Sequence, residues 1–258
     1  MYLDLIGSFL ALALLVGMLI CFEVGRRIGK ARLLHHPEGL AKGGGAVEAG
    51  VYGLLGLLVA LTFSGGASRF EARRHLVTEE ANAISTAYYR INLLPAAAQP
   101  GMRQLFREYL DTRLETYRKL PDIGAAMIGL ARSNQLQGEI WTKAIAACEE
   151  SSTQAIYMLM LPALNQMFDI TTTRFEATRN HPPLFIYLLL AALCLIASLM
   201  AGYGMSHNKD RSWLHIVIFA VTLSLAVYVI IDLEYPRMGL IRIDAADQTL
   251  DELRKSMQ

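Results

Sequence analysis

The sequence has few cysteines and little net charge. Its three cysteines, Cys21, Cys148 and Cys194, form no CxxC pair and no disulfide framework. Two of them, Cys21 and Cys194, fall inside apolar runs, where free cysteine packs as a small apolar side chain. The formal net charge is only +1, so the chain lacks the concentrated basic face that nucleic-acid binding requires. These absences exclude a domain held together by disulfides and argue against a nucleic-acid partner.

Catalytic and metal-binding patterns are missing as well. The six histidines include no HExxH motif and no helical pair at ligand spacing, and neither GxxxxGKS/T nor GxSxG occurs. The adjacent Glu79 and Glu80 are expected to be solvated helix positions rather than an acid/base pair. We therefore predict no enzyme activity, no metal site and no cofactor.

Long apolar runs are what the chain has in abundance. There are four, at residues 3–22, 47–64, 184–205 and 213–232. A helix of roughly 20 apolar residues spans a bilayer and satisfies its own backbone hydrogen bonds there. The first run has no basic start and no small-residue cleavage site, so it is not a removable signal. With 53% hydrophobic residues and a mean hydropathy of +0.33, the chain is predicted to be a multi-pass membrane protein.

The polar middle of the chain is predicted to be helical too, which makes the fold class all-α. Apolar residues recur at helical spacing over residues 68–94, so the second spanning helix is expected to continue into the polar region, broken at most at Gly65-Gly66. Further helices are expected at residues 102–120, 125–132, 136–178 and 247–257, with a kink at Pro162. The predicted domains are two transmembrane helices (1–64), a helical extramembrane domain (65–183), two more transmembrane helices (184–235) and a C-terminal tail (236–258).

Two faces of the second spanning helix differ in character. One is a stripe of small residues, which let membrane helices approach closely and therefore predict packing within the subunit or between subunits: Gly50, Gly53, Gly56 and Ala60. The neighbouring face is charged or polar at both ends and apolar at its centre: Glu48, Tyr52, Leu55, Val59, Thr62, Gly66, Arg69 and Arg73. Around a central pore this face would give a charged mouth, an apolar constriction and, with Arg74, a basic vestibule. On a packed subunit it would simply belong to a helix that leaves the membrane.

Three charged residues cluster where the fourth spanning helix ends. They are Asp232, Glu234 and Arg237. Charges at a membrane interface form structural ties or contribute to ion selectivity, and both interpretations stay open here. Arg69 is a possible partner of Asp232, because both lie at the same membrane face.

Several segments together resemble the bestrophin-like family of bacterial membrane proteins, whose domain has no assigned function. They are VYGLLGLLVA at 51–60, FEARR at 70–74, EEANAI at 79–84, YYRINLLP at 88–95, YLDTR at 109–113 and IDLEYPRMGLIR at 231–242. The resemblance covers nearly the whole chain, and its motifs are specific only in combination.

This resemblance implies a layout and a class of function. Bestrophins are pentameric anion channels with four membrane helices per subunit, a pore lined by the second helix and a helical domain that extends it. Their calcium-coordinating acidic pattern is not visible here, so calcium gating is not carried over. Bestrophins keep both termini in the cytoplasm. By contrast, Arg26, Arg27, Lys209 and Arg211 in the short loops place those loops in the cytoplasm and the termini outside.

Two functions follow as hypotheses. The first is a homo-oligomeric ion channel of the bacterial inner membrane, pentameric by resemblance, with inorganic ions and membrane lipid as its partners. Arg69, Arg73 and Arg74 at the mouth would favour anions. The second is a non-conducting membrane module that presents its helical domain to a signal or a protein partner.

Overall fold

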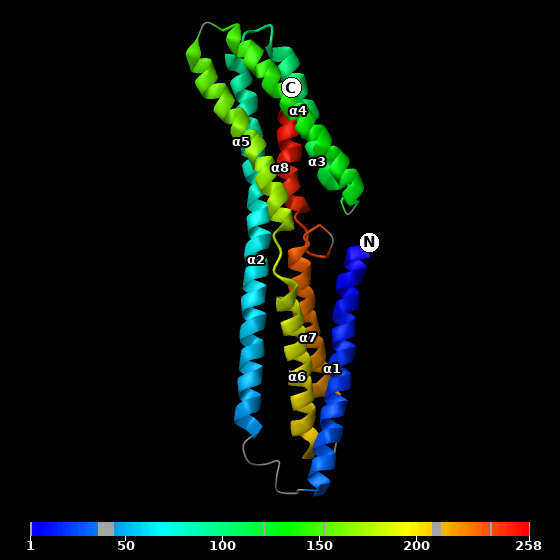
Figure 1. Ribbon diagram of the computed structural model, residues 1–258. Coiled ribbons are helices and arrows are strands. Elements are labelled where there is room, and N and C mark those ends of the chain that lie inside the picture. Colours follow the sequence, from blue (N-terminus) through cyan, green and yellow to red (C-terminus); the bar gives the residue numbers. More distant parts are fainter. Residues whose placement is uncertain are drawn as a thin grey trace. The chain divides into compact units, whose positions relative to one another are not determined.

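The computed structural model describes residues 2–35, 44–120, 122–151, 153–207, 213–237 and 239–257. Within these ranges the chain is helical and contains no strand, which confirms the predicted all-α class (Figure 1). The α-helices are α1 (Tyr2–His35), α2 (Gly44–Arg90), α3 (Gln99–Arg118), α4 (Ile123–Glu149), α5 (Gln154–Arg179), α6 (Leu184–Gly204), α7 (Trp213–Glu234) and α8 (Asp244–Ser256). Two short 3-10 helices are η1 (Ile91–Leu93) and η2 (Met205–His207).

Four helical stretches of the described chain are long and apolar enough to cross a membrane, and they lie along α1, along α2, along α5 with α6, and along α7. The predicted apolar runs lie within these helices, although the run at 184–205 ends in η2. α1 continues well past residue 22, the end of its apolar run, where Arg27 pairs with Glu23 one turn earlier at 3.0 Å. α2 is one unbroken helix of 47 residues, which confirms that the second spanning helix continues into the polar region.

The helices between residues 120 and 180 differ from the prediction. The expected pieces at 125–132 and from 136 onward are a single helix, α4, whose start is capped by the Asp122 carboxylate accepting from the amide of Ala125 at 3.0 Å. The expected single run at 136–178 is instead two helices, because α4 ends at Glu149 and α5 begins after an extended Thr153. Thr153 makes no side-chain capping hydrogen bond, but serine and threonine disfavour helix interiors because their hydroxyls compete for the backbone, which suits a break at Ser151 and Thr153. Pro162 lies inside α5.

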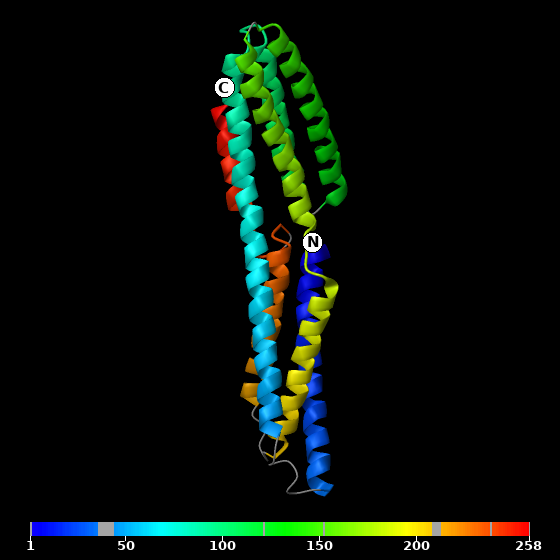
Figure 2. The same ribbon diagram turned by 60° about the vertical axis from the view of Figure 1, so that its left-hand side comes forward.

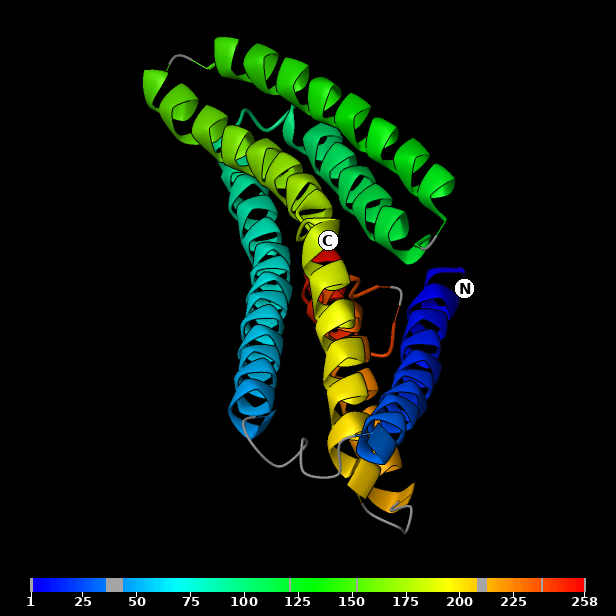
Figure 3. The same cartoon turned by 60° about the horizontal axis from the view of Figure 1, so that its bottom comes forward.

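The described chain divides into two compact units. Unit 1 comprises Met1–Ser68 and His181–Tyr235, and its core lies between α1, α6 and α7 (Figure 3). Among the described residues, α2 contributes only Leu55 to the fully buried apolar core of this unit. Lys209 and Arg211, which entered the orientation argument, lie outside the described residues.

Glycines close the crossing of α1 and α6 in unit 1. A Cβ atom on Gly25 would lie 2.0 Å from the Leu199 carbonyl oxygen, and one on Gly202 would lie 2.0 Å from the Phe22 carbonyl oxygen. A Cβ atom on Gly29 would likewise lie 2.4 Å from the Oγ of Ser206 in η2. Gly25 and Gly29 form a GxxxG pair, the spacing that lets two membrane helices touch backbone to backbone. The closest helix packing in this unit therefore depends on α1 and α6.

Unit 2 comprises Arg69–Asn180 and Pro236–Gln258. It contains the second part of α2 together with α3, α4, α5 and α8, and α3 and α4 lie side by side as an antiparallel pair (Figure 2). Its largest fully buried apolar side chains come from α2, η1, α3, α4 and α5: Ile84, Ile91, Met102, Phe106, Tyr109, Leu110, Leu136, Ile140, Met160 and Leu164. α8 is joined to α3 by Arg254, whose guanidinium donates to both carboxylate oxygens of Asp111 at 2.7 and 3.0 Å.

Candidate functional site

The face of α2 that was predicted to line a pore lies against its own subunit in unit 1. Leu55 is only 3% exposed. The Tyr52 hydroxyl donates to the Ala197 carbonyl oxygen at 3.4 Å, and its ring meets the edge of Phe219 at 6.3 Å. The remaining members of this face in unit 1 are buried or half-buried: Glu48, Val59, Thr62 and Gly66. This face packs inside the subunit, so it does not form a free surface of the isolated chain.

The two arginines that end this face are also turned inward within unit 2. Arg73 is buried, and its guanidinium donates to the carbonyl oxygens of Ala177 and Asn180, each at 3.0 Å. A cation at these last carbonyls stabilises the C-terminal end of α5. Arg69 is half-buried, whereas Arg74 is exposed and lies 3.7 Å from the Glu71 carboxylate. Of the three arginines predicted to form a basic vestibule, Arg74 has the most accessible charge.

The small-residue stripe, by contrast, is open. Gly50, Gly53, Gly56 and Ala60 are all exposed, and a Cβ added to any of the three glycines would meet nothing within 4 Å. Leu57 and Leu61 are exposed beside this stripe. Only 6% of the most apolar stretch of α2 is buried, against 22–28% for the other three spans. The stripe is therefore not packed within the described part of the subunit. It is left to pack against another subunit or to face outward.

The charged residues at the end of α7 have separate surroundings. Glu234 is buried, its carboxylate lies 3.4 Å from His181 Nδ1, and the His181 ring stacks on Tyr235 at 4.7 Å. Asp232 is buried as well. In unit 2 Arg237 donates to both oxygens of Asp247, at 2.7 and 2.9 Å. These contacts suit structural ties, and the predicted pairing of Arg69 with Asp232 stays a prediction.

Glu80 was predicted to be solvated, and this prediction is wrong. Its carboxylate is completely buried in unit 2 and accepts hydrogen bonds from Arg113, at 2.6 Å, and from Arg174. Arg113 and Arg174 also lie over the ring of Tyr117, with guanidinium carbons 5.0 and 4.0 Å from its centre. No local pattern marks this cluster, because Glu80 follows the exposed Glu79 and its partners are 33 and 94 residues away.

The buried charge cluster fixes the protonation state of its carboxylate. Burial by itself would raise the pKa of Glu80, but Arg174 and Arg113 together outweigh burial and lower that pKa to about 2. Two guanidinium groups then share one carboxylate, so the cluster carries an excess positive charge. Through Glu80, Arg113 and Arg174 the cluster joins helices α2, α3 and α5.

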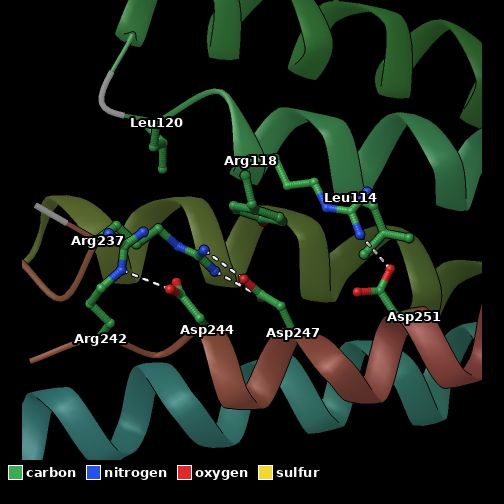
Figure 4. Close-up of a pocket in the computed structure, with 9 residues that line it drawn as sticks. Leu114, Arg118, Leu120, Arg237, Arg242, Asp244, Asp247 and Asp251 are labelled. Carbon is green, nitrogen blue, oxygen red and sulfur yellow. Dashed lines mark hydrogen bonds and ion pairs between the residues drawn. The ribbon is translucent and has the colours of Figure 1, made fainter.

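A cavity of about 290 Å³ opens beside Tyr117 in unit 2 (Figure 4). Its wall carries three arginines and three aspartates, and each arginine is already paired. The pairs are Arg118–Asp251, Arg237–Asp247 and Arg242–Asp244, with closest N–O distances of 2.7 Å each. Among the described residues, no group of three or more His, Cys, Asp or Glu side chains is placed to hold a metal ion. The cavity thus offers paired charges rather than an open ligand set.

Comparisons with known proteins give a family and a fold. The profile of the Bestrophin-like domain matches residues 9–247. No curated protein matches the sequence.

Two crystal structures of a bacterial bestrophin homologue from Klebsiella pneumoniae, each with a single-residue mutation, are similar in fold. The alignment with the first, at 15% sequence identity, covers 93% of this chain and 97% of the homologue's chain, with a TM-score of 0.65. The alignment with the second, at 14% sequence identity, covers 97% of this chain and 99% of the homologue's chain, with a TM-score of 0.67. At these identities the likeness concerns the fold.

Proposed function

Because the chain belongs to the bestrophin-like family, we propose that it is a homo-oligomeric ion channel of the bacterial inner membrane. Two pairs of spanning helices flank the helical domain, and α2 of each subunit lines a shared pore. A pentamer is the arrangement that the family resemblance implies. Membrane lipid surrounds the assembly, and inorganic ions pass through it.

The exposed face of α2 is the observation that carries this proposal. In the isolated chain a residue that lines a shared pore must be exposed, because the lumen forms only between subunits. Gly53, Leu57, Ala60 and Ser64 meet this condition and follow one another at three- and four-residue spacing. The proposed lining therefore differs from the face predicted from the sequence, whose central residue Leu55 is buried.

This lining would have a constriction of leucine and small residues, followed by polar side chains further along α2. Leu57 narrows the lumen and gates it by excluding water, as apolar rings do in channels. Further along the same face of α2, Glu71, Arg74 and His75 are exposed. Ion preference then depends on the balance between Glu71 and Arg74, and the anion preference that we propose depends on Arg74.

Ion flux from reconstituted liposomes tests the proposal with a matched pair of variants. Leu57→Ala widens the proposed constriction and is expected to raise flux, whereas Leu55→Ala removes a side chain from the subunit core and leaves the lumen unchanged. Arg74→Glu is expected to lower the ratio of anion to cation flux, and Glu71→Gln to raise it. A well-folded oligomer without flux, over a range of pH and voltage, would instead favour the non-conducting membrane module.

A further inference from the structure

The first two turns of α4 carry an exposed apolar surface that takes no part in the proposed pore. Ile123, Met127 and Ile128 are 60%, 51% and 73% exposed. Gly124 and Ala131 are exposed on the same side of the helix, and no charged residue occurs from Ile123 to Ala131. A soluble helix normally presents polar residues outward. We call Ile123, Met127 and Ile128 the α4 apolar face.

The outward side of α4 changes character immediately after this face. Arg132, Asn134 and Gln135 are exposed and polar or charged, in the next turn of the same helix. The inward side of α4 packs normally throughout, since Gly129 lies against Thr116 and Leu136 is fully buried. The apolar outward surface is therefore confined to one end of the helix.

That end of α4 lies where the chain enters and leaves unit 2. Leu120, three residues before Ile123, lines the same cavity as Arg237, the second residue of the returning chain. Arg237 stands 4.8 Å from the centre of the Tyr117 ring. The chain also enters unit 2 at Arg69 and leaves it at Asn180. These two points lie close together, because Arg73, four residues after Arg69, donates to the Asn180 carbonyl oxygen at 3.0 Å.

Short connections tie this end of unit 2 to the spanning helices. α6 begins at Leu184, four residues after Asn180, and α7 ends at Glu234, two residues before Pro236. Four residues reach at most ~14 Å when fully extended. The apolar run of α2 ends at Ser64, five helical residues or ~7.5 Å along the axis before Arg69. The α4 apolar face therefore lies at the end of unit 2 where the chain enters and leaves, a few residues along the chain from the spanning helices.

We propose that the α4 apolar face inserts into the headgroup region of the bilayer that the chain spans. An exposed apolar surface with a polar rim is what a segment lying in the membrane interface requires. Arg118 and Lys119, both exposed just before α4, are paired with Asp251 and Glu115, so the proposal rests on the apolar residues and not on free cations beside them. The inference depends on the spanning helices and does not depend on ion conduction.

Site-directed fluorescence in liposomes tests this proposal. Ile128→Cys and, separately, Ile123→Cys are labelled with an environment-sensitive fluorophore in a Cys21→Ser background, because Cys148 and Cys194 are buried. Gln135→Cys, exposed two turns further along the same helix, is the matched control. The unsubstituted background must take up no label. The labelled protein is reconstituted with and without lipids that carry a quencher in the upper acyl chain.

The proposal expects blue-shifted emission at positions 123 and 128 and strong quenching by the labelled lipid, with neither effect at position 135. Blue-shifted emission without lipid quenching would mean that protein, such as a second copy of this chain, covers the face, and it would overturn the proposal. Emission at 123 and 128 that matches position 135 would place the face in water and would overturn it equally.

Discussion

Replacing Glu80 by glutamine removes the carboxylate that binds both Arg113 and Arg174. Glutamine keeps the shape of the side chain, so the change isolates the charge. Breaking a buried ion pair by removal of one partner typically costs about 3–5 kcal/mol, because the remaining charge stays buried without compensation. Here two guanidinium groups, 1% and 5% exposed, would be left in that state. We expect Glu80→Gln to destabilise the protein by about that amount.

Thermal unfolding of the purified chain in detergent measures this effect. For a protein of this size, about 1 kcal/mol shifts the midpoint by roughly 2–4 °C, so Glu80→Gln should lower it by roughly 6–20 °C. Glu79→Gln is the matched control, because Glu79 is the adjacent carboxylate, is exposed and lies 3.3 Å from His75. Exposed substitutions usually stay within about 0.5 kcal/mol. Equal midpoints for the two variants would refute the assignment of Glu80 to a buried charge cluster.

The same cluster sets a dependence of stability on pH. Because the pKa of Glu80 is held at about 2, below its ordinary value of 4.5, the carboxylate stabilises the folded state fully above pH 4.5. That contribution is lost as pH falls from 4.5 through 2. The midpoint difference between the parent protein and Glu80→Gln is therefore expected to shrink over this interval. A difference that grows on acidification would contradict the assigned direction.

Two further predictions concern packing in each unit. Gly25→Leu places a side chain where a Cβ already lies 2.0 Å from the Leu199 carbonyl oxygen, so it should force α1 and α6 apart and abolish recovery of folded protein in size-exclusion chromatography. Gly53→Leu, where nothing lies within 4 Å, should leave the single subunit folded, and similar losses for both variants would contradict this. Arg254→Ala removes the bidentate pair with Asp111 and should speed amide hydrogen exchange in α8, at a cost of about 1 kcal/mol for a partly exposed pair. Lys255→Ala is its control, and equal exchange in the two variants would show that the pair does not hold α8.

The spanning helices and the unbroken α2 could be predicted because their signals are local. Apolar length alone marks a membrane helix, and the absence of proline between residues 67 and 94 permits a continuous helix. The faces of α2 could not be assigned in the same way. Small residues predict close packing, yet the glycines that pack closely are Gly25, Gly29 and Gly202, whereas Gly53 and Gly56 are open.

The reason is that a helix face does not specify what it meets. Leu55 at the centre of a polar-ended stripe suits both an apolar constriction and a subunit core, and the structure puts it in the core. The prediction that Glu80 is solvated fails for a related reason, since its partners come from α3 and α5 and only the tertiary fold brings them together. Local pattern identifies elements, and long-range contacts decide the role of each side chain.

Cysteine accessibility tests the proposed pore most directly. Leu57→Cys and Leu55→Cys proteins, both in the Cys21→Ser background, are reconstituted into liposomes, and ion flux is recorded before and after a bulky thiol-reactive reagent is added. If the exposed face of α2 lines the pore, the reagent blocks flux through Leu57→Cys and leaves Leu55→Cys unchanged. Flux through Leu57→Cys that persists after complete labelling, or block at Leu55→Cys, would contradict the proposed lining.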